Sequence, residues 1–193
     1  MYELSPDILI SGYSNGYFPM AEGDTNEIYW YSPDERAIFP IDDIKFAKSL
    51  MKKIRRNEFE FAIDRNFEAT IRACAQTHEQ TWISEEIISA YVRLFEIGFA
   101  HSVETYIDGN LVGGLYGVAI GGAFFGESMF NLATDASKAA FYYLVQNLRA
   151  RGYELLDSQF LNDFTEQLGA IEIPKSVYLY LLENALKKNC IFN

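Results

Sequence analysis

The sequence predicts an α+β fold, in which one main domain follows a small N-terminal subdomain. A length of 193 residues suits one domain with a small companion. Hydrophobic residues make up 49% of the chain and aromatic residues 16%, which predicts a packed core and excludes disordered and coiled-coil proteins. Three predicted antiparallel strands, a helix and a further strand follow one another, an order typical of mixed α+β sheets.

The N-terminal subdomain is expected over residues 1–35 and the main domain over 36–193. Ser5 as N-cap and Pro6 at the first helical position predict a short helix that runs toward Tyr17. The aromatic and β-branched segment Ile28–Tyr31 predicts a strand.

The first part of the main domain alternates helices and a strand. Apolar residues recur every four positions from Ile44 to Arg56, which predicts an amphipathic helix. Period-two alternation predicts a strand over 58–63, followed by a helix over 67–76. Ser84 is the expected N-cap of a helix over 85–97, which ends at a glycine.

The second part contains the predicted sheet. A hairpin is expected around Asp108-Gly109-Asn110, and a third strand after the second turn. We expect the later elements in this order: a helix over 135–151, a strand over 154–158, and helices over 163–168 and 175–188. The strands before and after the crossover helix should be parallel, which is the arrangement of the acetyltransferase-like (GNAT-like) fold.

The net charge of −11 argues against a nucleic-acid-binding protein in general. Residues 36–56 differ, because they hold seven Lys or Arg side chains, including Arg36, against two aspartates. The predicted amphipathic helix presents a basic face, formed by Lys48, Lys52, Arg55 and Arg56. Taken alone, such a face is more often solvated surface than a binding site.

Several classes of protein are disfavoured. The longest nearly uncharged run, 111–126, is rich in glycine and shorter than a membrane span, and the N-terminus lacks the pattern of a secretory signal, so a cytoplasmic protein is expected. Cys74 and Cys190 lack disulfide or zinc spacing, and Cys74 is expected in the core. His78 and His101 do not form a metal-binding pattern, so no metal is expected.

Three polar residues stand where parallel strands end. Ligands bind outside the carboxyl ends of such strands, so Glu127, Asp157 and Gln159 should face a common cleft. Two acids and an amide there suit acyl transfer to an amine, although an aspartate at a strand end is more often a cap. The glycines of 113–122 do not form a phosphate-binding loop and predict close packing of a strand, and 131–136 lack the glycines that would bind coenzyme A.

Eight segments stand out along the chain: WYSPD (30–34), TWI (81–83), AHSVE (100–104), LVGGLYGVA (111–119), FGESMF (125–130), ASK (136–138), LDSQ (156–159) and LGAIEIP (168–174). In their sequence and order, these segments resemble the leucyl/phenylalanyl-tRNA-protein transferase family. The resemblance spans roughly residues 5–182. It implies an acetyltransferase-like domain that moves Leu or Phe, with Met as a further candidate, from aminoacyl-tRNA to the N-terminal Arg or Lys of acceptor proteins, marking them for N-degron proteolysis.

The resemblance also implies roles for single residues. Asp157 and Gln159 match the catalytic acid and amide, and Glu127 the carboxylate beside the acceptor amine. Trp30 and Trp82 would lie near the terminal adenosine of the tRNA, and no cofactor, membrane contact or oligomeric partner is implied. The donor side chain would occupy an apolar pocket formed by Leu115, Phe124, Met129, Leu144, Leu148 and Leu156. Leu144 and Leu148 replace bulkier aromatic residues of better-known members, so a shifted donor preference is expected; in any fold they could also be core residues.

Two other functions remain open on the sequence. One is an N-acyltransferase with a different donor, such as coenzyme A. The other is a non-catalytic module that binds tRNA or degradation-signal peptides. Transfer from charged tRNA to a peptide with an N-terminal arginine would separate the three.

Overall fold

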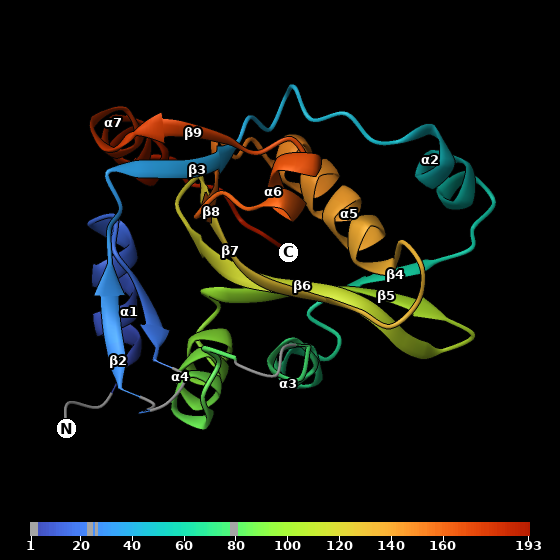
Figure 1. Ribbon diagram of the computed structural model, residues 1–193, viewed down its shortest axis with the longest axis horizontal. Coiled ribbons are helices and arrows are strands. Elements are labelled where there is room, and N and C mark those ends of the chain that lie inside the picture. Colours follow the sequence, from blue (N-terminus) through green and yellow to red (C-terminus); the bar gives the residue numbers. More distant parts are fainter. Residues whose placement is uncertain (1–3, 23–24, 26, 78–80) are drawn as a thin grey trace.

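A seven-stranded mixed sheet carries helices on both faces (Figure 1) in the computed structural model, which describes residues 4–22, 25, 27–77 and 81–193. The helix α5 (Ala136–Arg151) covers one face, and α3 (Phe67–Ala75) and α4 (Glu85–Glu96) cover the other. The strand order is β4-β5-β6-β7-β8-β3-β9. The strands are β3 (Glu35–Phe39), β4 (Glu60–Ile63), β5 (Ala100–Ile107), β6 (Asn110–Ile120), β7 (Ala123–Asn131), β8 (Leu155–Gln159) and β9 (Ile171–Pro174).

The centre of the sheet confirms the predicted topology. Strands β5, β6 and β7 form an antiparallel meander, and its first turn places Asp108 and Gly109 at φ of 50° and 77°. Both positive angles belong to the tight hairpin turn that this sequence predicts. After α5 crosses over, β8 pairs with β7 in parallel, as the acetyltransferase-like fold requires.

The N-terminal segment forms a separate two-stranded sheet beside this one. Helix α1 (Pro6–Ser14) begins as expected, with Ser5 Oγ accepting the amide of Ile8 at 3.4 Å. Strand β2 (Ile28–Tyr31) was predicted, whereas its partner β1 (Phe18–Ala21) was not. The helix ends three residues before Tyr17, and the chain then enters β1.

Three further differences from the predictions lie in the main sheet and its helices. Strand β3 is inserted between β8 and β9, and neither β3 nor the short edge strand β9 was expected. Helix α2 (Lys48–Arg55) begins later than predicted, because Ile41 and Ile44 are buried and their carbonyls accept hydrogen bonds from Arg149. The C-terminal helices are α6 (Asp163–Gln167) and α7 (Lys175–Leu186).

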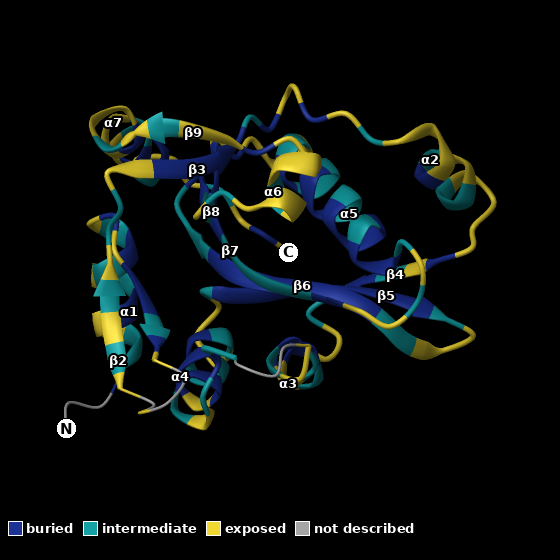
Figure 2. Ribbon diagram, in the orientation of Figure 1, coloured by how far each residue is buried: buried dark blue, intermediate teal, exposed yellow. Residues whose placement is uncertain are grey.

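The core has two main layers, one on each face of the sheet (Figure 2). Residues from α1, α3, α4 and α7 fill one layer, including the buried thiol of Cys74. Residues from α5 and the other face of the sheet fill the second layer. Within the described ranges, no helix combines the length and the apolar character that a membrane crossing requires.

Candidate active site

The candidate site lies where β7 and β8 separate. The two strands pair only from Ala123–Phe125 to Leu155–Asp157, although both continue beyond. A cavity of about 490 Å³ opens in this fork. Glu127, Asp157 and Gln159 all line it, so the fold brings the three predicted polar residues together.

Glu127 is the extra residue of a β-bulge. Tyr116 of β6 pairs with Ser128, whereas the next residue, Gly117, pairs with Gly126, so Glu127 has no partner of its own. Bulges re-aim side chains and are common beside active sites. A Cβ atom on Gly117 would lie 2.3 Å from the carbonyl oxygen of Phe125, so this position requires glycine.

Substitution of Gly117 with alanine is expected to lower the free energy of unfolding by about 1–3 kcal/mol, because the added methyl group forces the bulge to move. Urea denaturation measures the change. Gly126→Ala is the matched control, since its Cβ atom would meet only an ordinary contact of 3.4 Å with the carbonyl of Asp157. Equal losses in both variants would contradict this account of the bulge.

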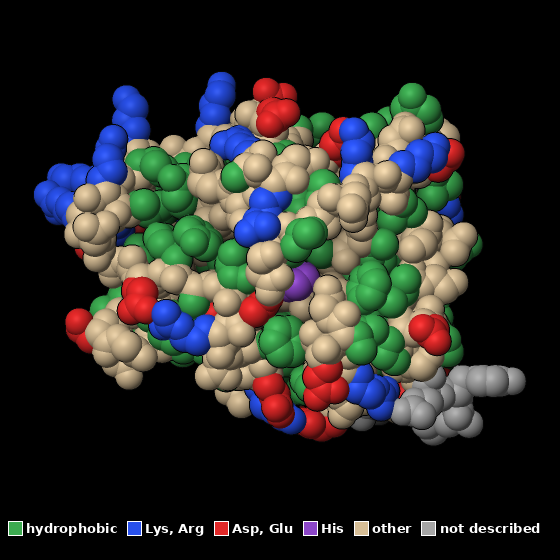
Figure 3. Space-filling model, turned by 180° about the vertical axis from the view of Figure 1, so that it is seen from behind, with side chains coloured by type: hydrophobic (Ala, Val, Ile, Leu, Met, Phe, Trp, Pro, Cys, Tyr) green, Lys and Arg blue, Asp and Glu red, His purple; other side chains and the backbone are tan. Residues whose placement is uncertain are grey.

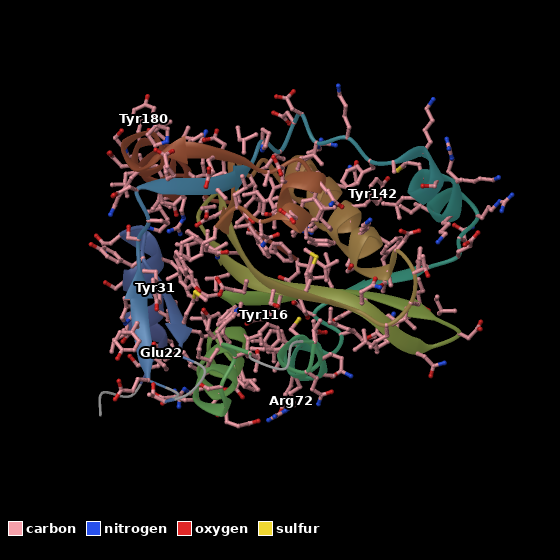
Figure 4. All side chains as sticks on the ribbon, viewed as in Figure 1. Glu22, Tyr31, Arg72, Tyr116, Tyr142 and Tyr180 are labelled. Atoms are coloured by element: carbon pink, nitrogen blue, oxygen red, sulfur yellow. The ribbon has the colours of Figure 1, made fainter. Side chains whose placement is uncertain are left out.

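Three neutral groups donate hydrogen bonds to the Glu127 carboxylate. Tyr13 of α1 donates to Oε1 at 2.7 Å, Tyr91 of α4 to Oε2 at 3.2 Å, and Gln159 Nε2 to Oε1 at 3.0 Å. The two tyrosine hydroxyls also contact each other. Tyr116, which is labelled in Figure 4, belongs to the same core cluster as Tyr13 and Tyr91. Its ring packs edge-on against the rings of Tyr91 and Phe67.

Burial raises the pKa of Glu127 to about 8, above its ordinary value of 4.5. The hydrogen bonds from Tyr13 and Tyr91 oppose this rise, and the negative charge of Asp157 adds to it. A carboxylate that is costly to ionise gains most from a cationic partner, because the partner's charge favours the ionised form. The position is therefore suited to bind a positively charged group.

Asp157 forms a buried ion pair with Arg36, a residue that the sequence placed in the basic segment 36–56. Arg36 Nε donates to Oδ1 at 2.9 Å and Nη2 to Oδ2 at 2.6 Å, with both side chains at most 1% exposed. The guanidinium lies 4.5 Å from the ring centroids of both Phe18 and Tyr178. Tyr178 also donates its hydroxyl to Asp157 Oδ2 at 2.8 Å.

The contact between Asp157 and Gln159 runs through the backbone. Residues two apart on an extended strand point to the same side, so the sequence predicts a contact between the two side chains. Instead, Asp157 Oδ1 accepts the backbone N–H of Gln159 at 2.9 Å. Ser158 forms a second bulge opposite β3, and Gln159 has a φ of 58°, so the chain is not extended here. Asp157 thus holds the backbone of Gln159, whose side chain points to Glu127.

Most of the cavity wall is apolar. Four of the six predicted pocket residues line it, namely Leu115, Met129, Leu144 and Leu156. Phe124 and Leu148 do not line it; both are fully buried in the layer between α5 and the sheet. Leu148 is thus a core residue, the alternative that its helical spacing left open.

Other predicted residues lie in different places. Trp82 lines the cavity, whereas Trp30 is outside its lining and packs on Gly12 of α1. Lys48, Lys52, Arg55 and Arg56 are exposed around α2, and Figure 3 shows the Lys and Arg side chains that project at this end of the molecule. His101 is bonded to Asp64 at 2.7 Å, and His78 lies outside the described residues.

Sequence reasoning missed several residues of the site. Phe39 and Phe141 line the cavity, and Tyr13, Tyr91 and Arg36 hold the polar groups. Phe141 precedes Leu144 by three positions on α5, so helical spacing could have indicated it. No local pattern indicates Arg36, because its partner lies 121 positions away.

Comparisons with known proteins find relatives over almost the whole chain. The leucyl/phenylalanyl-tRNA protein transferase family model matches residues 38–183, and the model of that family's N-terminal domain matches residues 2–34. The leucyl/phenylalanyl-tRNA–protein transferase of Gloeobacter violaceus is 52% identical over 98% of this chain and 97% of that protein. Its counterpart from Chlorobium luteolum is 46% identical over 96% of this chain and 97% of that protein.

Among solved structures, L-PGS from Bacillus licheniformis is similar, with a TM-score of 0.48 and 13% identity. The similarity covers 95% of this chain and 71% of that one.

Proposed function

Because the chain belongs to the leucyl/phenylalanyl-tRNA protein transferase family, we propose that it transfers leucine or phenylalanine from aminoacyl-tRNA to an N-terminal arginine or lysine of acceptor proteins. The observation that carries this proposal is the meeting of Glu127, Gln159 and Asp157 at an apolar cavity. Transfer would mark the acceptor for N-degron proteolysis. We further propose that the enzyme acts as a cytoplasmic monomer, with residues 1–35 as a subdomain and 36–193 as the catalytic domain.

The donor side chain would occupy the apolar part of the cavity. Leu115, Leu144 and Leu156 offer an apolar surface and no charge. The amine nitrogen of the acceptor then bonds to the ester carbonyl carbon, the bond from that carbon to the tRNA ribose oxygen breaks, and a proton from the amine passes to the ribose oxygen, which leaves as a hydroxyl. The ester is already activated, so the enzyme gains most by alignment, which is worth up to roughly 7–11 kcal/mol.

The acceptor would bind at Glu127. A guanidinium or ammonium group there forms charge-assisted hydrogen bonds with the carboxylate and offsets the cost of its burial. Gln159 Nε2 is engaged by Glu127, which leaves the amide oxygen of Gln159 to accept a hydrogen bond from the attacking amine. Asp157 is proposed as a positioning residue, since both of its oxygens are bonded to Arg36.

The tRNA would approach from the end of the molecule that carries α2. Lys48, Lys52, Arg55 and Arg56 would contact phosphates, and Trp82, at the cavity, would lie near the terminal adenosine. We propose that Trp30, whose ring packs on Gly12 of α1, also contacts the adenosine. Lys53 links α2 to the N-terminal end of α5, because its ammonium pairs with Asp135 at 2.6 Å.

Incubation with leucyl-tRNA and a peptide that begins with arginine tests the function. Transfer of labelled leucine to the peptide supports it, while binding without transfer indicates a non-catalytic module. Transfer from an acyl-coenzyme A alone would indicate the other acyltransferase. One observation argues against coenzyme A as the donor. Its pyrophosphate would need free backbone amides at the start of α5, but the amide of Ser137 there already donates to Asn131 Oδ1 at 2.9 Å.

The cavity predicts a donor order. Leucine, methionine and phenylalanine should all be transferred, whereas valine and isoleucine, branched at Cβ, should be transferred poorly. Amino acids with a charged side chain should not be transferred, because the apolar wall leaves that charge without a partner. Rates with a set of charged tRNAs measure the order. Equal transfer of valine, isoleucine and leucine would show that the donor pocket is elsewhere.

Reversal of charge on α2 is expected to weaken tRNA binding. In the double variant Lys52→Glu/Arg55→Glu, affinity should fall for every tRNA alike. The slope of log affinity against log salt should flatten by about one to two units, because each lost phosphate contact contributes up to roughly 0.9. Lys187→Glu/Lys188→Glu on the far side of the molecule is the control. An unchanged salt slope in Lys52→Glu/Arg55→Glu would show that α2 does not contact the tRNA.

A further inference from the structure

The ring of Phe192, near the C-terminal end of the chain, is buried in the core layer that contains the donor cavity. It is 2% exposed and shares an apolar cluster with Leu115, Leu144 and Leu156, which line the cavity. Figure 1 shows the C-terminal tail returning from α7 to the middle of the molecule. The tail therefore forms part of the surroundings of the cavity although it follows the last helix.

Phe192 is stacked between two rings from different strands. Its centroid lies 5.1 Å from that of Phe124 on β7 at 20°, and 4.4 Å from the His101 ring on β5 at 23°. Tyr153 contacts it edge-on at 6.2 Å. Phe124 is consequently held on one side by the tail.

Phe124 lies beside Leu156, a residue of the cavity wall. It pairs with Leu156 of β8 and with Ala119 of β6. Its ring extends back along β6 over Gly117, where a Cβ atom would lie 2.5 Å from the ring. Leu115, two residues before Gly117 on β6, points to the same face of the sheet and belongs to the same apolar cluster as Phe124. Gly117 limits the ring on the sheet side, and Phe192 limits it on the other.

Polar contacts fix the tail in this position. Arg151 donates to the carbonyl of Ile191 at 3.0 Å, and Asn147 to that of Phe192 at 2.9 Å. Asn193 donates to Asp64 at 2.9 Å, the carboxylate that also binds His101. These bonds come from the main domain on both sides of the ring, so the position of Phe192 is defined.

We propose that Phe192 sets the depth of the donor cavity, and with it the preference between leucine and phenylalanine. It keeps Phe124 in place beside Leu156, which limits the depth of the cavity. Without the ring, Phe124 can move back and the cavity deepens, which favours the longer phenylalanine side chain over leucine. This inference rests on the proposed donors.

The test compares kcat/KM for leucyl-tRNA and phenylalanyl-tRNA in the full chain and in Phe192→Ala. The ratio of phenylalanine to leucine transfer is expected to rise about tenfold in the variant, the change that small differences in an apolar pocket produce. Phe192→Leu, which keeps more of the apolar volume, should show a smaller rise and guards against a failure of the alanine variant to fold. Phe95→Ala is the control, since that ring is stacked on Phe67 on the opposite face of the sheet.

A raised ratio in both Phe192 variants and an unchanged ratio in Phe95→Ala supports the inference. An unchanged ratio in folded Phe192 variants overturns it, as does an equal rise in Phe95→Ala, which would show general loosening. In these two cases the unmodified protein still transfers both amino acids, so the proposed function stands. Failure of the unmodified protein to transfer either amino acid would overturn both.

Discussion

Replacement of Asp157 with alanine is expected to reduce both stability and transfer. The free energy of unfolding should fall by about 3–5 kcal/mol, because Arg36 would keep a buried charge without its partner. The single-turnover rate should fall by on the order of 10², because Gln159 loses the acceptor that holds its backbone. Affinity for aminoacyl-tRNA should change little. Urea denaturation and rapid-quench transfer measure the two effects.

A double variant separates the two roles of Asp157. Arg36→Met/Asp157→Leu removes both charges, so its stability should return toward that of the unmodified protein. The transfer rate should stay low, since leucine cannot accept the Gln159 amide hydrogen. Recovery of the rate together with stability would show that Asp157 has only a structural role. If Asp157 only capped the end of its strand, Asp157→Ala would lower the free energy of unfolding by about 1 kcal/mol. The expected loss is larger because Asp157 is a partner in a buried ion pair.

The Glu127→Gln variant is expected to lose acceptor binding and to gain stability. Removal of the charge should lower kcat/KM for a peptide with N-terminal arginine by roughly 10- to 100-fold, the value of a charge-assisted hydrogen bond. Transfer assays over a range of peptide concentrations measure it. Glu104→Gln is the matched control, because Glu104 is a fully buried carboxylate of β5 outside the cavity lining. Normal use of the peptide by Glu127→Gln would exclude Glu127 from acceptor binding.

The gain in stability should depend on pH. Burial raises the pKa of Glu127 to about 8 in the folded protein, whereas the unfolded chain has the ordinary value of 4.5. Between these values the folded state binds more protons, so the contribution of Glu127 to stability falls as pH rises. Glutamine does not titrate, so the advantage of the variant should grow from pH 5 to pH 8 and then level off. Denaturation curves at several pH values check this, and a constant difference would contradict it.

Elements with strong local patterns were predictable from the sequence. Ser84 and the helix after it, the hairpin at Asp108-Gly109, and α5 with its glycine cap occur as expected. Strand β3 was missed because Ala37, Ile38 and Phe39 are all buried, so the strand lacks the alternation that marks a half-exposed strand. Strands β1 and β9 each have four residues and contain a proline, which weakens the pattern of a strand.

The candidate site was predictable where residue type and strand end coincide. Glu127, Asp157 and Gln159 follow from the order of strands around the crossover, and Leu144 follows from the family resemblance. The partners of these residues could not be predicted, since the Arg36–Asp157 pair and the Tyr13–Glu127 bond join segments 121 and 114 positions apart. Arg36 was counted in the basic segment 36–56 and given no role in the site, because the sequence shows its charge and not its burial.

The position of β3 between two strands made late has a consequence for folding during synthesis. This strand is made early, yet both of its neighbours, β8 and β9, are made near the end of the chain. While the ribosome works through the intervening residues, β3 has no strand with which to pair, and its buried apolar residues stay available to other contacts. Pairings between distant segments also form slowly. The newly made chain should therefore require a chaperone most during the interval before β8 emerges, and it should acquire activity only after release.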